Sequence, residues 1–282
     1  MDISEKLKKG YEIAQWCDNP WSPEGKERYE NALKKFGKLL KHPWLAELAS
    51  GKISILDLGA GRGIGGVALA KTLIDKDVEV ELTMVDLRES AVKDSLKFAK
   101  EERIKAKAYR MDAIEAYKLG RFDLVLMYGA ILAHFDSWAL PRLFASAAEA
   151  LRENGVVIVE EMDRIHAIFM SRFKEFIVEN PKPEALSISV HAGYDPVKGS
   201  YLRNYIRVKD WEVVTLPVNF RSISTIASTL WLFLKDIDIV RTETENLYLV
   251  LGKTPRGLLK PEHLEEPTVI KRGKTLEFFL VI

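Results

Sequence analysis

Cysteine, glutamine and long apolar runs are all scarce in this sequence of 282 residues. Its single cysteine, Cys17, excludes an internal disulfide and a metal cluster built on cysteines. No uninterrupted apolar run is long enough for a membrane span, and the polar N-terminus does not resemble a secretion signal. We therefore expect a cytoplasmic protein without membrane contact. The single glutamine, beside abundant glutamate and lysine, is typical of heat-adapted proteins.

An excess of charge of one sign is also missing. The 42 Lys and Arg residues nearly balance the 41 Asp and Glu residues, which leaves a formal net charge of +1. Proteins dedicated to nucleic-acid binding usually carry a basic excess. The balance therefore argues against that class, although it leaves room for local basic patches.

Apolar, β-branched runs alternate with amphipathic segments through the middle of the chain. This alternation predicts a doubly wound, Rossmann-like sheet of parallel strands with helices between them. The predicted strands span residues 53–59, 78–87, 105–113, 122–130 and 156–163. The predicted helices between them span residues 64–76, 88–103 and 137–154.

The alternation is interrupted after the fifth strand. A predicted helix at 164–179 is followed by three antiparallel strands in an insertion at about 185–220, and then by a helix at 223–234. The runs at 237–245 and 246–254 are joined by almost nothing, so they must form a hairpin. We therefore expect a seven-stranded sheet whose last strand is antiparallel.

The flanking segments differ from this central region. Residues 1–50 are predicted to be helical, and residues 51–254 form the α/β domain that contains the insertion. Residues 255–282 form a tail that ends in the apolar run LEFFLVI. That run suggests packing or dimerisation, so a homodimer is one predicted assembly.

The segment ILDLGAGRGIGG at 55–66 can be read in two registers. Gly61, Gly63 and Gly66 spell the G-x-G-x-x-G of a dinucleotide-binding loop, whereas Gly59, Gly61 and Gly63 follow an acid, Asp57, with the spacing of a methyltransferase loop. Glycines at a strand-to-helix turn let the backbone and its N–H groups approach a ligand in either class. The glycines alone therefore leave both cofactors open.

Further features favour the second register. Asp86 closes the second strand, where its two oxygens can accept hydrogen bonds from ribose hydroxyls in either class. A second acid, Asp112, ends the third strand and precedes Ala113. The short-linked antiparallel hairpin at the end of the sheet also replaces another βαβ unit.

The motifs DLGAGRG, VDL, MDA and FDLVLMYGA, in this order and spacing, resemble motifs I to IV of the class I S-adenosylmethionine-dependent methyltransferases. The resemblance covers residues 53–163 and resumes at 237–254, where LYLVLGKTP is similar to the last strand of that family. It implies S-adenosylmethionine as the cofactor and a methyltransferase activity.

The resemblance also implies roles for individual residues. Asp57 would orient the amino group of the cofactor, Asp86 would hold its ribose and Asp112 would accept from its adenine amino group. A structural interpretation of Asp57 and Asp112 is that they only cap strands or helices. The other implied contacts are Gly59, Ala60 and Gly61 against the methionine end, Leu87 and Ala113 against the adenine, and Tyr128 and Gly129 beside the transferred methyl group.

Several methyl acceptors are disfavoured by the residues after the fourth strand. Met127-Tyr128-Gly129-Ala130 lacks the Pro-Pro motif of enzymes that methylate nucleobase amino groups, and no cysteine stands there for cytosine C5 methylation. The carboxylates of Glu160, Glu161 and Asp163 have no evident partner for a metal, so no metal site is predicted. We therefore expect an oxygen or nitrogen acceptor on a small molecule. An RNA or protein methyltransferase is the alternative, and an NAD-dependent oxidoreductase is less favoured.

His134 is the histidine nearest to the predicted methyl site. It could act as a general base beside Tyr128, although the favoured interpretation is that it caps or packs at the start of the next helix. The peptide GYEIAQWCD resembles the N-terminal helix that covers the cofactor in small-molecule methyltransferases. Residues 1–50 are therefore predicted to form an N-terminal helical lid, with Tyr11 and Trp16 as candidate lid residues. Packing of the helix on the main domain is an equal alternative.

In the insertion, YLRNYIRV places Tyr201, Arg203, Tyr205 and Arg207 on one face of a strand. Such a face could bind an anionic substrate or RNA, form a subunit interface, or be the solvated side of the sheet. The near-neutral charge favours the last two interpretations over nucleic acid.

Overall fold

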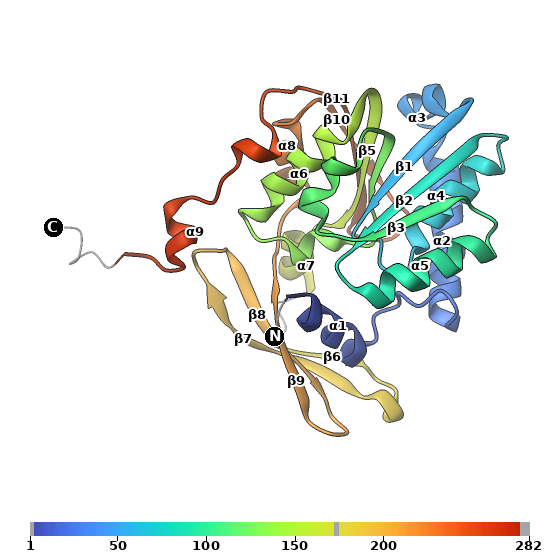
Figure 1. The fold of residues 1–282 in the computed structure, drawn as a ribbon. Coiled ribbons are helices and arrows are strands. Elements are labelled where there is room, and N and C mark those ends of the chain that lie inside the picture. The colour runs from blue at the N-terminus through green and yellow to red at the C-terminus, as the bar shows by residue number, and fades with distance from the viewer. Residues whose placement is uncertain (1–2, 172–174, 277–282) are drawn as a thin grey trace.

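A computed structural model describes residues 3–171 and 175–276. Its centre is a seven-stranded sheet with the strand order β10-β11-β5-β4-β1-β2-β3, and a separate four-stranded sheet lies at one end of the molecule (Figure 1). Strand β11 runs antiparallel to both of its neighbours, β5 and β10. The predicted fold class is therefore confirmed, including the antiparallel last strand. The strands of the large sheet are β1 (Lys52–Leu58), β2 (Glu79–Asp86), β3 (Ala106–Arg110), β4 (Phe122–Met127), β5 (Leu151–Met162), β10 (Leu234–Arg241) and β11 (Leu247–Pro255).

Helices cover both faces of this sheet because successive residues of its buried strands are apolar and point to opposite sides. In β1, for example, Ile53 and Ile55 pack against one layer of helices, while Leu56 and Leu58 pack against the other. Each fully buried side chain of this size contributes about 1.5–3 kcal/mol. One layer holds α2 (Pro23–Leu39), α3 (Pro43–Leu48), α4 (Ile64–Ile74) and α5 (Glu89–Glu101). The other layer holds the short helix η1 (Ala113–Leu119), α6 (Ala139–Glu149) and α8 (Ile223–Trp231).

The insertion contains four strands instead of the predicted three. The predicted helix at 164–179 is too long, because the helix ends at Ser171 and residues 176–180 form an additional strand. That segment, FIVEN, is rich in β-forming residues and pairs antiparallel with the next strand. The elements of the insertion are α7 (Arg164–Ser171), β6 (Phe176–Asn180), η3 (Pro183–Ala185), β7 (Ser187–Asp195), β8 (Ser200–Arg207) and β9 (Glu212–Val218).

The boundary between α6 and β5 also differs from the prediction. The helix ends at Glu149 instead of residue 154, and the strand already begins at Leu151. Leu151 pairs with Phe122 of β4, and the register of the two strands shifts just after this pair. The first residues of β5 therefore pair with β4 through a β-bulge or similar irregularity. Hydrophobic periodicity does not predict such an irregularity.

The N-terminal helix α1 (Ile3–Ala14) lies on the inserted sheet and not on the large one. Its residues Ile13 and Ala14 form a small apolar core with Tyr205, Val214 and Leu216. The remaining short elements are η2 (Ile131–His134), η4 (Pro261–His263) and α9 (Thr268–Arg272). The apolar run predicted to pack or dimerise lies outside the described residues except for its first residue. Among the helices that are described, none has the length and apolar character needed to cross a bilayer.

Candidate active site

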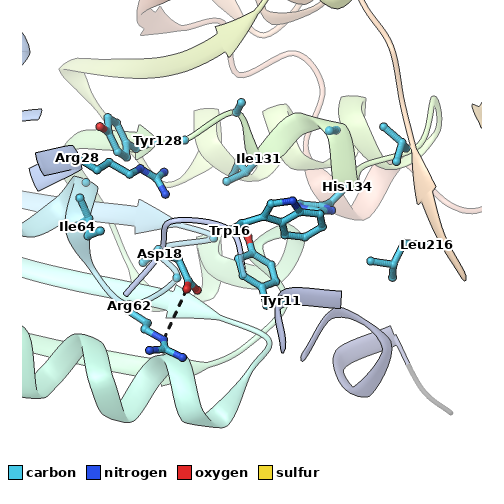
Figure 2. Close-up of a pocket in the computed structure, with 18 of the residues that line it drawn as sticks. Tyr11, Trp16, Asp18, Arg28, Arg62, Ile64, Tyr128, Ile131, His134 and Leu216 are labelled. Atoms are coloured by element: carbon cyan, nitrogen blue, oxygen red, sulfur yellow. Dashed lines mark ion pairs between the residues drawn. The ribbon is translucent and has the colours of Figure 1, made fainter. Parts of the chain in front are cut away.

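Two adjoining cavities lie at the edge of the sheet where the parallel strands end, which is the usual ligand site in this architecture. The first has a volume of about 260 Å³ and the second about 200 Å³. Figure 2 shows the side chains of the first cavity, with those of α2 and the glycine loop on one side and those of the inserted sheet on the other. The residues common to both cavities are Tyr11, Gly59, Ile131, His134 and Pro217.

The glycine loop between β1 and α4 adopts the conformation that the methyltransferase register requires. Gly59, Gly61 and Gly63 have φ angles of 66°, 56° and 90°, a region that favours glycine. Gly66, which belongs only to the dinucleotide register, lies inside α4 without a positive φ angle, and it lets the helix pack closely against Asp57 of β1. Gly59, Ala60 and Gly61 all line the first cavity, and their contacts to a methionine group stay a prediction.

Asp57 is buried at the end of β1, with 1% of its surface exposed. Its Oδ2 accepts a hydrogen bond from the N–H of Gly66 at 2.9 Å, which fixes the start of α4 against the strand. Its Oδ1 has no hydrogen-bond partner among the described residues, yet Asp57 lines the first cavity. Burial raises the pKa of this carboxyl to about 8, despite the hydrogen bond from Gly66. The capping interpretation is thus correct for Oδ2. Oδ1 is available to accept a hydrogen bond from a ligand.

Asp86 lies at the end of β2 and lines the second cavity. Its oxygens accept from the N–H of Gly61 at 2.8 Å, and from the N–H and Nε of Arg88 at 2.8 and 3.1 Å. Arg88 also pairs with Asp18 at 3.0 Å and lies 3.7 Å from the ring centre of Tyr11. The predicted ribose ligand is therefore connected to the N-terminal segment through one buried guanidinium.

The second cavity collects the residues that are predicted to contact adenine. Leu87, Asp112 and Ala113 all line it. The Oδ1 of Asp112 accepts from the N–H of Ile114 at 3.0 Å and caps η1, so the capping interpretation is correct for this oxygen. The carbonyl of Leu87 accepts from the hydroxyl of Ser4 at 2.9 Å, which brings α1 to the rim of the same cavity.

Tyr128 and Gly129 follow β4 and line the first cavity. The Tyr128 ring packs at 5.6 Å from Phe36 and within cation–π distance of Arg28 and Lys35, all three on α2. Burial raises the pKa of the phenol, so it carries no charge at neutral pH. The ring thus faces α2, which favours a structural role for Tyr128 over a catalytic one.

His134 lies in η2 between the two cavities, in contact with aromatic residues of the N-terminal segment. Its ring centre is 6.4 Å from that of Tyr11 and 6.2 Å from that of Trp16 (Figure 2). Burial, aided by Arg164, lowers its pKa to about 4, so the imidazole is neutral at pH 7. Its ring packs against Tyr11 and Trp16 and also borders both cavities, so this position leaves both the packing and the general-base interpretations open.

Four charged residues of the first cavity were missed by sequence reasoning. Asp18 and Arg28 come from the N-terminal segment, Arg62 from the glycine loop and Arg164 from the start of α7. Asp18 stands in the peptide that resembles a lid and Arg62 in the glycine loop, but no spacing or motif links the four residues to one another. Their meeting depends on how α2 and the inserted sheet pack around the edge of the large sheet.

The centre of the Arg/Tyr face of β8 is buried, so it is neither the solvated side of the sheet nor an exposed surface for RNA or a second subunit. Arg203 is 4% and Tyr205 is 5% exposed. Arg203 donates to the carbonyl of Ser189 at 3.0 Å, and the Tyr205 ring packs edge-on against Trp16 at 5.3 Å. Tyr205 lines the first cavity, so this face forms a wall of the site.

The acids at the end of β5 are engaged by neighbouring residues. Glu160 pairs with Lys35 of α2, and Glu161 accepts from the N–H of Leu132 at 3.0 Å. Within residues 3–171 and 175–276, no group of three or more His, Cys, Asp or Glu side chains is arranged to hold a metal ion.

The fold is that of the class I S-adenosylmethionine-dependent methyltransferases. A family model, the methyltransferase small domain, matches residues 39–180, which is just over half of the chain, and the chain therefore belongs to this family. No curated protein matches it.

Solved structures with the same fold are similar over most of their length. A protein from Pyrococcus horikoshii OT3 superposes with a TM-score of 0.57 and 17% identity, over 84% of this chain and 94% of that one. An S-adenosylmethionine-dependent methyltransferase from Clostridium acetobutylicum gives 0.56 and 16%, over 79% and 92%. A sugar N-methyltransferase from a Streptoalloteichus species gives 0.54 and 11%, over 80% and 88%. At these identities the likeness establishes the fold alone.

Proposed function

We propose that this protein binds S-adenosylmethionine and transfers its methyl group to an oxygen or nitrogen atom of a small molecule. The observation that carries the proposal is the pair of joined cavities. One is lined by the acids and apolar residues suited to a nucleoside, and the other by the glycine loop and Asp57. Their junction at Gly59 and His134 is where the sulfur of such a cofactor would lie.

For methyl transfer, the protein has mainly to align the acceptor atom with the methyl group and to exclude water. The cofactor, when bound, supplies an activated methyl group on a sulfonium. The glycine loop would fix one end of it and Asp86 the ribose, so that proximity and orientation lower the barrier. Trp16 and Tyr205 give the first cavity an aromatic surface. Such a surface excludes water and is compatible with the positive charge of a sulfonium.

The enclosure of the first cavity supports a small acceptor. Helix α1 and the inserted sheet close over the first cavity, and Leu216 and Tyr205 line its far side. The burial of Arg203 and Tyr205 leaves less of the Arg/Tyr face exposed to RNA, which supports a small acceptor. The sugar N-methyltransferase among the structures of the same fold is compatible with a small polar acceptor.

Binding of the cofactor product separates this function from the oxidoreductase alternative. In isothermal titration calorimetry, we expect S-adenosylhomocysteine to bind at micromolar concentration and NAD not to bind. The reason is that Asp57 and the positive-φ glycines suit the methyltransferase register. Binding of NAD with no binding of S-adenosylhomocysteine would overturn the proposal.

We further propose that His134 accepts the proton of the acceptor group. It is neutral at pH 7 and lies between the two cavities, so its ring nitrogen can receive a hydrogen bond there. Replacing it in His134→Gln should lower kcat about 100-fold or more, the usual effect of losing a general base, with unchanged affinity for S-adenosylhomocysteine. Turnover that is unchanged in His134→Ala, with normal cofactor affinity, would leave His134 a packing residue only.

We propose a lid narrower than the whole of residues 1–50. Helix α2 belongs to the core of the large sheet through Ala32 and Phe36, whereas α1 contacts the cavities through Tyr11 and the following Trp16. A chain that begins at residue 19 should keep a cooperative unfolding transition but bind S-adenosylhomocysteine at least tenfold more weakly, because Tyr11 lines both cavities. Equal affinity in the truncated chain would rule out the lid.

A further inference from the structure

We propose that Arg28 binds the carboxylate of the cofactor's amino-acid end and forms, with Asp57, a clamp for an α-amino-acid group. The inference rests on the proposed function. It adds a residue that lies outside the motifs and outside the region matched by the family model, which starts at residue 39.

Arg28 is held in place by the start of α2. Ser22 caps this helix by accepting from the N–H of Gly25 at 3.0 Å, and Pro23 occupies its first turn. One turn further on, the guanidinium of Arg28 donates from Nη1 to the carbonyl of Cys17 at 2.8 Å. The side chain then reaches into the first cavity between Tyr128 and the glycine loop (Figure 2).

The backbone at Gly129 is shaped around this guanidinium. Gly129 has a φ of 86°, and a Cβ atom built on it would collide with Nη2 of Arg28. The Cζ atom of Arg28 lies over the Tyr128 ring, 5.3 Å from the ring centre. Arg28 is therefore seated at the wall of the cavity and is not an arginine of the open surface.

Arg28 differs from the other arginines of this cavity in its charge partners. Arg62 pairs with Asp94 at 3.4 Å, and Arg164 with Glu161 at 3.3 Å. Throughout the described residues, no carboxylate lies within 4.0 Å of the Arg28 guanidinium. A cation seated at a cavity wall without an anionic partner suits a bound carboxylate, which a guanidinium can hold with two parallel hydrogen bonds.

Asp57 supplies the complementary group at the same end of the cavity. Its buried Oδ1 has no hydrogen-bond partner in the described parts of the chain. Asp57 accepts from the N–H of Gly66, and the Tyr128 ring over which Arg28 lies packs against the neighbouring Gly65, so both residues flank the start of α4. A carboxylate and a guanidinium at one wall match the ammonium and carboxylate of an α-amino acid. The clamp would therefore bind the methionine group of the cofactor, while the second cavity would bind its nucleoside.

Two nucleosides distinguish the clamp from a general effect on the site. S-Adenosylhomocysteine carries the amino-acid group, whereas 5′-methylthioadenosine has the same adenosine and thioether without it. We expect Arg28→Met to weaken S-adenosylhomocysteine binding about 30- to 100-fold in calorimetry and to change 5′-methylthioadenosine binding less than twofold. Arg28→Lys should recover part of the loss, since the charge is kept but the bidentate geometry is not. Lys26→Met removes the same charge from an exposed position of the same helix and should change neither affinity.

The outcomes are separable. Equal losses for both nucleosides, or no loss for S-adenosylhomocysteine, would overturn the clamp while leaving the proposed function intact. If the unmodified protein binds 5′-methylthioadenosine as tightly as S-adenosylhomocysteine, the amino-acid group is not read and the clamp is also wrong. Binding of neither nucleoside by the unmodified protein would contradict the proposed function itself.

Discussion

Asp57→Asn should reduce the affinity for S-adenosylhomocysteine by about 100-fold, close to the upper range for a hydrogen bond to a charged group. The amide oxygen can still accept from Gly66, but the amide N–H₂ would face the ammonium of the cofactor where Oδ1 now lies unpaired. The fold should be unaffected at pH 7. Burial raises the pKa of Asp57 to about 8, so the native carboxyl is already protonated in the free protein and is close to an amide in shape and charge.

The same pKa gives the binding a specific pH dependence. Below pH 8 the free protein holds a proton on Asp57, and this proton must leave when the carboxylate pairs with an ammonium. The affinity of the unmodified protein should therefore rise about tenfold per pH unit up to pH 8 and then level off. Asp57→Asn has no proton to release and should lose this slope. An affinity that is independent of pH in the unmodified protein, or unchanged in the variant, would show that Asp57 does not pair with the ligand.

Gly66→Ala should lower the free energy of unfolding by about 2–4 kcal/mol, through overpacking and a lost buried hydrogen bond. A Cβ atom at this position would lie 2.6 Å from Oδ2 of Asp57 and 3.1 Å from Leu82. Relief of that contact separates α4 from β1 and breaks the bond between the Gly66 N–H and Asp57. Urea denaturation of the ligand-free protein measures the loss directly.

Gly37→Ala is the matched control for this substitution. Gly37 is also a helical glycine, but a Cβ atom there meets nothing within 4 Å. Alanine should therefore leave stability unchanged or raise it by up to about 1 kcal/mol, which is the helix-propensity difference. If both variants behave alike, the close packing of α4 against Asp57 is not a determinant of stability.

The large sheet could be predicted because its signals are local and periodic. Buried parallel strands such as 53–59 are continuous apolar runs, and the glycine loop needs positive φ angles at Gly59, Gly61 and Gly63. The acids Asp57, Asp86 and Asp112 line the two cavities because parallel strands all end at one edge of the sheet. Their roles toward the cofactor stay predictions.

The remainder of the site depends on packing between segments far apart in the sequence. The prediction of a helix at β6 is wrong because a segment of five residues is too short for its hydrophobic pattern to distinguish a strand from a helix. Arg203 and Tyr205 face inward because α1 covers the inserted sheet, and the pattern along β8 only shows that they share a face. Arg28 belongs to a helix without a motif, so its approach to Gly129 is visible only in three dimensions.

Transfer of a labelled methyl group tests the central claim most directly. The protein would be incubated with an extract of its source cells and with methyl-labelled S-adenosylmethionine at a concentration near its Kd, and the products separated by ultrafiltration. Asp57→Asn, which should bind the cofactor about 100-fold more weakly, is the control. The structure predicts label in the small-molecule filtrate with the unmodified protein, and its loss in the variant. Label that is retained with RNA or protein would contradict the small-molecule acceptor, and label transfer that is equal in both proteins would contradict the site itself.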